Sequence, residues 1–154
     1  MIVTTFDKSK HLLELGLDPD SADMYYTGHR SIHNPKEIEY TQEPRVRTKF
    51  VSFDRLEVFF PAWSLSALLE VMPITITKDG MEYKLKVFPS GLFSTHSDTS
   101  KWTLQYCGID YSYKSRDKYP ILVKVTQHDL IFAAYEMVCW LLENKLIKKG
   151  DNNE

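Results

Sequence analysis

Apolar and polar positions repeat along the chain with two different periods, and each period predicts a type of element. An apolar side with helical spacing occurs at residues 7–15 and again at 64–72. Gly16 after the first pattern and Pro73 after the second favour helix ends at these points. The longest helical pattern covers residues 127–147. We therefore expect about three helices, with the longest at the C-terminus.

A period of two residues marks the strands. It is clearest in residues 74–78 and 81–88, which flank the pair Asp79 and Gly80. An Asp-Gly pair between two alternating runs predicts a hairpin, because both central residues of the turn take positive φ. Residues 33–44 are polar and contain two prolines, so they predict a mobile loop. Shorter strand patterns lie at residues 24–26, 45–50, 56–60, 102–106 and 121–125.

This order of elements predicts an α+β fold with a small, mostly antiparallel sheet. The length of 154 residues and the 43% hydrophobic content suit a single domain over residues 1–150, followed by a disordered tail at 151–154. The chain lacks the basic start and long apolar stretch of a signal peptide, and its apolar runs are shorter than the ~20 residues of a spanning helix. We expect a cytoplasmic protein with no membrane association.

One side of the C-terminal helical pattern is not explained by a simple amphipathic helix. Glu136 lies on the acidic side of this pattern, yet Phe132 and Trp140, four residues before and after it, lie near the same line. Two interpretations stay open. Another element of this chain covers the side, or Phe132, Glu136 and Trp140 form a surface for a protein partner or a second copy, where aromatic anchors are common.

Candidate residues for chemistry are few. His29 and His33 have the spacing of a helical metal pair, but the neighbouring Gly and Pro disfavour a helix there. His96, Asp98 and Cys107 suggest a small enzyme only if the fold brings them together. No nucleophile-elbow or phosphate-binding glycine motif occurs. We expect no catalytic residues, no metal and no cofactor, and an enzyme is the least favoured class.

A basic strand offers an alternative function. Arg45, Arg47 and Lys49 alternate with apolar residues, and Arg55 follows them. Such a strand, with Tyr40 as a stacking ring, would suit nucleic acid. The net charge of −2 and three preceding glutamates argue against a dedicated nucleic-acid protein and suggest a charge-mixed, solvated strand.

Three blocks carry a resemblance to a known group of proteins. They read LLELGLDPDSADM at residues 12–24, PAWSLSALLEVMP at 61–73 and AYEMVCWLLEN at 134–144. In these blocks the chain resembles small proteins without assigned activity that are encoded in prophages and mobile elements of gut bacteria of the Bacteroidales type. The resemblance implies a bacterial or phage cytoplasmic protein and supplies no catalytic or binding residues.

The leading prediction is a non-catalytic protein-interaction module, an accessory protein of a phage or mobile element. The aromatic content of 13% and the crowded C-terminal helix favour it. A nucleic-acid-associated accessory protein that uses the segment from Arg45 to Arg55 is the alternative. The partner is expected to be another protein or a second copy of the chain.

Overall fold

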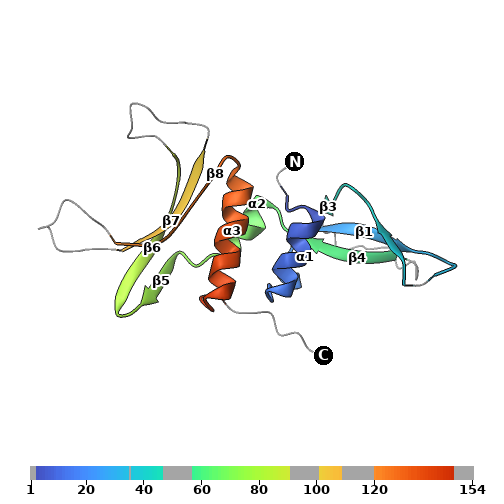
Figure 1. The fold of residues 1–154 in the computed structure, drawn as a ribbon, viewed down its shortest axis with the longest axis horizontal. Helices are drawn as coiled ribbons and strands as arrows, with labels where there is room; N and C mark the ends of the chain where they lie inside the picture. The colour runs from blue at the N-terminus through green and yellow to red at the C-terminus, as the bar shows by residue number, and fades with distance from the viewer. Residues whose placement is uncertain (1–2, 35, 47–56, 91–100, 109–119, 148–154) are drawn as a thin grey trace, which may run out of the picture.

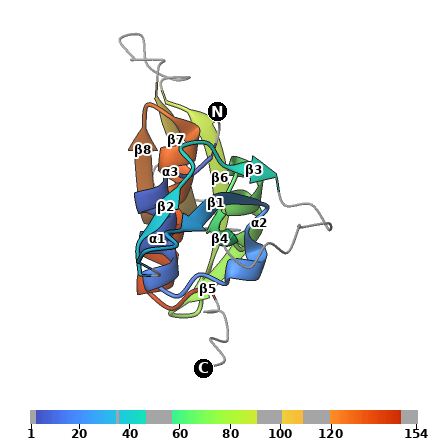
Figure 2. The ribbon, with the colours of Figure 1, turned by 90° about the vertical axis from the view of Figure 1, so that its right-hand side faces the viewer.

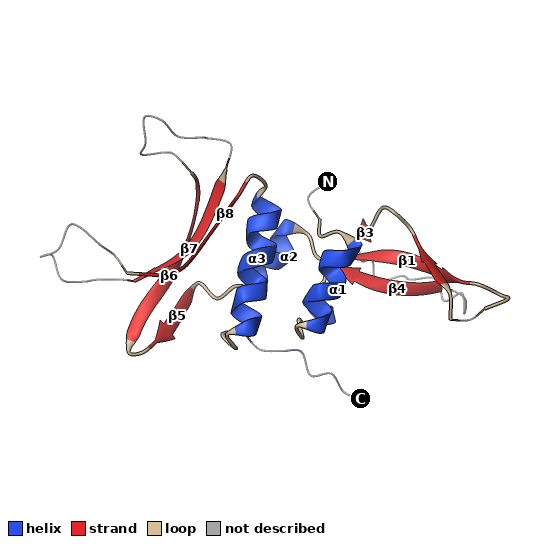
Figure 3. Ribbon diagram, viewed as in Figure 1, coloured by secondary structure: helices blue, strands red, loops and turns tan. Residues whose placement is uncertain are grey.

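The protein is seen here in a computed structural model that describes residues 3–34, 36–46, 57–90, 101–108 and 120–147. Within these residues three α-helices lie between two four-stranded antiparallel sheets (Figures 1 and 3). The elements are α1 (Phe6–Glu14), the 3-10 turn η1 (Pro19–Ser21), β1 (Met24–Arg30), β2 (Ile38–Tyr40), β3 (Arg45–Val46), β4 (Glu57–Ala62), α2 (Leu65–Val71), β5 (Thr75–Lys78), β6 (Met81–Pro89), β7 (Trp102–Gly108), β8 (Ile121–Gln127) and α3 (Leu130–Glu143). The predicted α+β class and the C-terminal position of the longest helix are confirmed.

Local signals in the sequence set the bounds of the first two helices. Thr5 caps α1 by accepting a hydrogen bond from the Lys8 N–H, and Gly16 follows the helix with φ 94°. Ser64 caps α2 through the Ala67 N–H. Because proline disfavours a helical residue before it, α2 ends just ahead of Pro73. Both predicted helices are confirmed.

The first sheet is built around β1, which pairs antiparallel with β2, β3 and β4. Strand β2 lies within residues 33–44, where we expected a mobile loop, and that prediction is wrong for residues 38–40. Three residues are too short for a period of two to stand out from the surrounding polar segment. The side chains of β2 lie close to β1, since a Cβ on Gly28 would come within 2.7 Å of those of both Ile38 and Tyr40. Figure 2 looks onto the end of the molecule that carries this sheet.

The second sheet has the order β5-β6-β7-β8, and every neighbouring pair is antiparallel. The predicted hairpin is confirmed, with Asp79 and Gly80 at φ 54° and 77° between β5 and β6. The small antiparallel sheet expected from the sequence is thus realised as two separate sheets. Their pairing is long-range, and a strand pattern does not reveal which strands share a sheet.

The core lies between the second sheet and the helices. Leu104 and Tyr106 on β7 and Leu68 on α2 are fully buried against Met137 and Leu141 of α3. Helix α3 packs on the sheet through β7 and β8 and on α2 from its other side (Figure 1). An apolar helix of this kind is expected where two layers cover it.

An aromatic cluster joins α1 to the first sheet. The ring of Phe6 lies 4.4 Å from that of Phe60, 4.6 Å from Tyr40 and 5.7 Å from Tyr26, measured between centroids. The Tyr26 hydroxyl donates to the Thr4 carbonyl at 2.9 Å. Tilted and edge-on ring pairs of this type add to the apolar contact they bury. They fix the N-terminus of α1 on the sheet.

Candidate functional site

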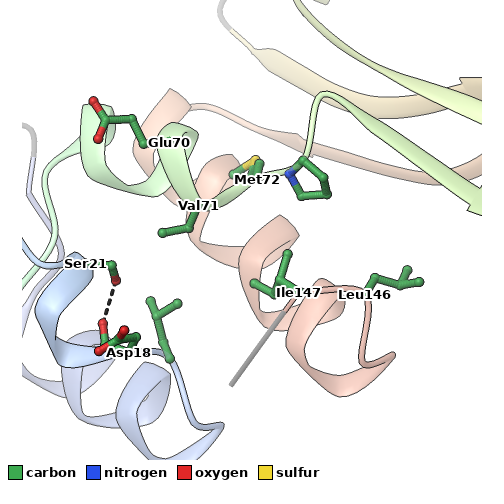
Figure 4. Close-up of a pocket in the computed structure, with 9 residues that line it drawn as sticks. Asp18, Ser21, Glu70, Val71, Met72, Leu146 and Ile147 are labelled. Atoms are coloured by element: carbon green, nitrogen blue, oxygen red, sulfur yellow. Dashed lines mark hydrogen bonds between the residues drawn. The ribbon is translucent and has the colours of Figure 1, made fainter. Parts of the chain in front are cut away.

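A cleft opens where the ends of the three helices meet (Figure 4). Its volume is about 430 Å³, within the range of ordinary ligand sites. Side chains from the segment after α1, from the end of α2 and from the segment after α3 face it. The lining residues are Leu17, Asp18, Ser21, Glu70, Val71, Met72, Pro73, Leu146 and Ile147.

The cleft follows from how each helix ends. Gly16 turns the chain after α1, and Leu17 then enters the core with 3% of its surface exposed. Pro73 ends α2 beside Met72. After α3, Lys145 takes φ 56° and turns the chain so that the Leu146 N–H donates to the Leu141 carbonyl at 2.9 Å. Three helix ends thus leave apolar side chains around one opening.

Polar groups in the lining are already engaged in local structure. The Ser21 hydroxyl donates to the Asp18 carbonyl at 2.5 Å and accepts from Trp63 Nε1 at 2.9 Å. The Asp18 carboxylate accepts from the Asp20 N–H at 2.9 Å, which fixes the start of η1. The nine lining residues include no histidine, cysteine or lysine. The cleft therefore offers an apolar surface with two carboxylates at its edges, and no base activates Ser21.

A highly exposed apolar residue follows the cleft lining in the sequence. Ile74 directly follows the lining residue Pro73 and has 71% of its surface exposed. Val71, Leu146 and Ile147 are half-buried. An apolar cleft with a highly exposed isoleucine next in sequence to its lining is more typical of a contact site than a single scattered apolar residue is.

The surface predicted on α3 is only partly open. Phe132 is 36% exposed, and the Lys8 ammonium lies 4.9 Å from the centre of its ring. Glu136 is exposed and accepts from Gln127 Nε2 at 2.7 Å. Trp140 is half-buried and packs against the core. Trp140 is thus partly covered by this chain, and Phe132 and Glu136 remain at the surface.

A second polar cluster, between α1 and α3, was missed in the sequence. His11 Nδ1 lies 2.6 Å from the Tyr135 hydroxyl and 3.9 Å from Cys139 Sγ. Burial raises the pKa of the Cys139 thiol to about 11, and it also raises the pKa of Tyr135. Both groups stay protonated at neutral pH, so the cluster holds no activated nucleophile. The 124 residues that separate His11 from Tyr135 hide this contact from any local motif.

The enzyme and metal candidates gain no support from the described residues. Cys107 is 4% exposed and accepts from Gln105 Nε2 at 2.9 Å, while His96 and Asp98 lie outside the described residues. His29 lies in strand β1, not in a helix, and His33 follows that strand. Among the residues that the structure describes, no three His, Cys, Asp or Glu side chains are grouped to hold a metal ion.

One of the four basic residues predicted to bind nucleic acid, Arg45, lies within the described residues. Arg45 is exposed on β3 opposite Tyr25, and Arg47, Lys49 and Arg55 lie outside the described residues. Tyr40, expected as a stacking ring, instead packs against both Phe6 and Phe60 in the aromatic cluster. Its ring is therefore taken up by contacts within the fold.

Comparisons of the chain with protein-family models, with curated proteins and with solved structures found no match. Within the described part of the chain, none of the helices combines the length and apolar character needed to span a bilayer. The resemblance to proteins of mobile elements stays a prediction.

Proposed function

We propose that this protein is a non-catalytic interaction module that binds an apolar peptide segment of a protein partner in the cleft at the helix ends. The observation that carries the proposal is the apolar lining of the cleft, with the highly exposed Ile74 next in sequence to its residue Pro73. Covering such a surface removes apolar area from water, which stabilises a complex by roughly 25 cal/mol for each Å².

The lining favours a peptide over a reacting substrate. Apolar side chains from Leu17 to Ile147 provide the contact area, and the one hydroxyl, on Ser21, is held by Asp18 and Trp63. The carboxylates of Asp18 and Glu70 at the edges would attract a lysine or arginine beside the apolar residues of the partner. We therefore expect a peptide with an apolar anchor next to a basic residue.

The proposal fits an accessory role in a phage or mobile element, acting in the cytoplasm of its host. This setting is supported by the three blocks that resemble proteins of such elements. Two of these blocks, residues 12–24 and 61–73, contain Leu17, Asp18, Ser21 and the α2 part of the cleft lining. The shared pattern and the proposed site therefore coincide in part.

Selection from a displayed peptide library tests the proposal. The wild-type protein should enrich peptides that carry an apolar residue beside lysine or arginine. The variant Ile74→Glu should bind them at least tenfold more weakly, because it places a charge on the apolar surface. Ile32→Glu is the matched control, since Ile32 is 80% exposed in the segment after β1, away from the cleft.

Equal loss of binding in both variants, or binding that neither variant changes, would contradict the cleft as the site. Sedimentation of the free protein at several concentrations separates a foreign partner from a second copy of the chain. A dimer that Ile74→Glu dissociates would identify self-association as the interaction. A protein that stays monomeric at all concentrations would instead support binding of a peptide from a different protein.

A further inference from the structure

One face of the second sheet is covered by the helices, and the other carries a group of lysines. Tyr83 and Leu85 on β6 pack toward the core with α3, so the residues between them point to the opposite face. That outer face presents Lys84, Lys86 and Lys124, all exposed. No helix or strand among the described residues lies over it (Figures 1 and 3).

The strand register places these lysines next to one another. Lys84 and Lys86 are two residues apart on β6, which separates their Cα atoms by about 7 Å. Gln105 on β7 is opposite Lys86 on one side and opposite Lys124 of β8 on the other. Two strand spacings of about 4.8 Å therefore separate Lys86 from Lys124. Within the described residues, the register therefore places the three lysines around Gln105 on the outer face of the sheet.

The charge of this face is opposite to that of the whole chain. Among the described residues, three lysines and one glutamate, Glu82, give the face a formal charge of +2, whereas the chain has a formal net charge of −2. Within the described residues, neither Lys84 nor Lys124 has an ion-pair partner. Like charges on neighbouring positions of a sheet repel one another, and a bound polyanion removes that repulsion.

The rest of the face combines threonines with one aromatic ring, the buried Cys107 and, opposite Cys107 on β8, the exposed Ile121. Thr126 is exposed, and its hydroxyl lies 3.0 Å from that of Thr103, a buried neighbour on β7. Phe88 of β6 is half-buried opposite Thr103. A membrane-binding surface would present several exposed apolar side chains beside its lysines. This face instead presents mainly hydroxyls and lysines, with one half-buried ring and one exposed isoleucine, which favours a water-soluble polyanion.

We propose that the outer face of the β5–β8 sheet binds single-stranded nucleic acid. Lys84, Lys86 and Lys124 would contact successive phosphates, Thr126 would donate a hydrogen bond, and the edge of Phe88 would pack against a base. The face of a sheet suits an unpaired strand, whose bases are free to stack on side chains. A duplex is read by an element that enters its groove, and among the described residues no helix or ribbon projects from this face. The surface is separate from the helix-end cleft and does not depend on it.

Fluorescence anisotropy with a labelled 20-nucleotide thymidine strand tests this proposal. Three phosphate contacts on a single strand predict a slope of about −2 for log affinity against log salt concentration. Raising the salt from 50 to 100 mM should then weaken binding about fourfold. In the triple variant Lys84→Gln, Lys86→Gln and Lys124→Gln, binding at 50 mM salt should fall at least tenfold, and the salt slope should approach zero.

A second triple variant, Lys10→Gln, Lys36→Gln and Lys145→Gln, is the matched control. It removes the same charge from exposed positions off the sheet and should keep both the affinity and the slope. Phe88→Leu should weaken binding to the thymidine strand without changing binding to polyphosphate, since only the former has bases. Thermal melting confirms that all variants remain folded.

Three results would overturn the proposal. The first is no binding to the single strand at 50 mM salt. The second is an equal loss of affinity in the two lysine triples, which would mean that net charge alone attracts the strand. The third is tighter binding to a polyglutamate peptide of the same charge than to the nucleic acid, which would assign the face to an acidic protein partner.

Discussion

Trp63 Nε1 donates a hydrogen bond to the Ser21 hydroxyl at 2.9 Å, which links the segment before β1 to the start of α2. The side chain of Trp63 is fully buried, so its N–H has no access to water. Ser21 in turn donates to the Asp18 carbonyl. The same hydroxyl therefore satisfies the indole and holds one wall of the helix-end cleft.

We predict that Ser21→Ala lowers the free energy of unfolding by about 1–3 kcal/mol, because it leaves the buried indole N–H without an acceptor. Urea denaturation followed by tryptophan fluorescence measures this loss. Ser66→Ala is the control, since Ser66 is exposed on α2 and its change should stay within about 0.5 kcal/mol. An equal effect of the two substitutions would show that the Trp63–Ser21 bond does not contribute to stability.

Gly28 and Gly80 are required for different physical reasons, and substitutions should distinguish the two reasons. A Cβ on Gly28 would clash with Ile38 and Tyr40 at 2.7 Å, whereas Gly80 has open space but φ 77°. Gly28→Ala should destabilise the protein by about 1–3 kcal/mol through overpacking. Gly80→Ala should cost about 1 kcal/mol through backbone strain.

Asparagine distinguishes the two causes. Asn tolerates the left-handed region, so Gly80→Asn should recover most of the stability that Gly80→Ala loses. Gly28→Asn should be worse than Gly28→Ala, because its side chain is larger. Thermal unfolding of the four variants checks the pattern, and a rescue by asparagine at position 28 would contradict the proposed clash.

Local features of the fold could be predicted from the sequence, and long-range features could not. The helix ends at Gly16 and Pro73 and the Asp79-Gly80 turn each depend on neighbouring residues, and each appears in the structure. The separation of the strands into two sheets depends on pairing between distant segments. Strand β2 was missed because its stability comes from its contact with β1 rather than from its own pattern.

The candidate sites also combine local features, which the sequence indicates, with long-range features, which it does not. Alternation within residues 81–88 is enough to put Lys84 and Lys86 on one face of β6, but their proximity to Lys124 depends on the register of three strands. The cleft depends on where three helix ends meet, which no periodicity indicates. The C-terminal helix was recognised as crowded, and the structure shows that Trp140 reaches the core while Phe132 does not.

That difference on α3 gives a third prediction. Trp140→Ala should lower stability by about 2–4 kcal/mol, since it removes a large side chain that packs against the core. Phe132→Ala should cost about 1 kcal/mol, which includes the loss of the Lys8 contact over its ring. Chemical denaturation measures both values. A larger loss at Phe132 than at Trp140 would reverse the assignment of core and surface on this helix.

The thiol of Cys139 should react slowly in the folded protein. Burial raises its pKa to about 11, so at pH 7.5 its thiolate fraction is roughly a hundredfold or more below that of an unfolded cysteine. Alkylation by iodoacetamide, located by mass spectrometry, should be at least that much slower in buffer than in 8 M urea. A reaction at Cys139 as fast in the native protein as in urea would contradict the buried, protonated thiol.

The same shift predicts how stability depends on pH. Because the pKa of Cys139 is higher in the folded than in the unfolded chain, its contribution is complete below about pH 9 and is lost as the pH rises toward 11. The free energy of unfolding should therefore fall with increasing pH in this window. The variant Cys139→Ser has no ionisable thiol at this position, so its free energy of unfolding should fall less over the same pH range. The fall that remains comes from other groups, including Tyr106 and Tyr135, whose pKa values are also raised by burial. Urea titrations from pH 7.5 to 10.5 compare the two slopes, and identical slopes would exclude Cys139 as a cause.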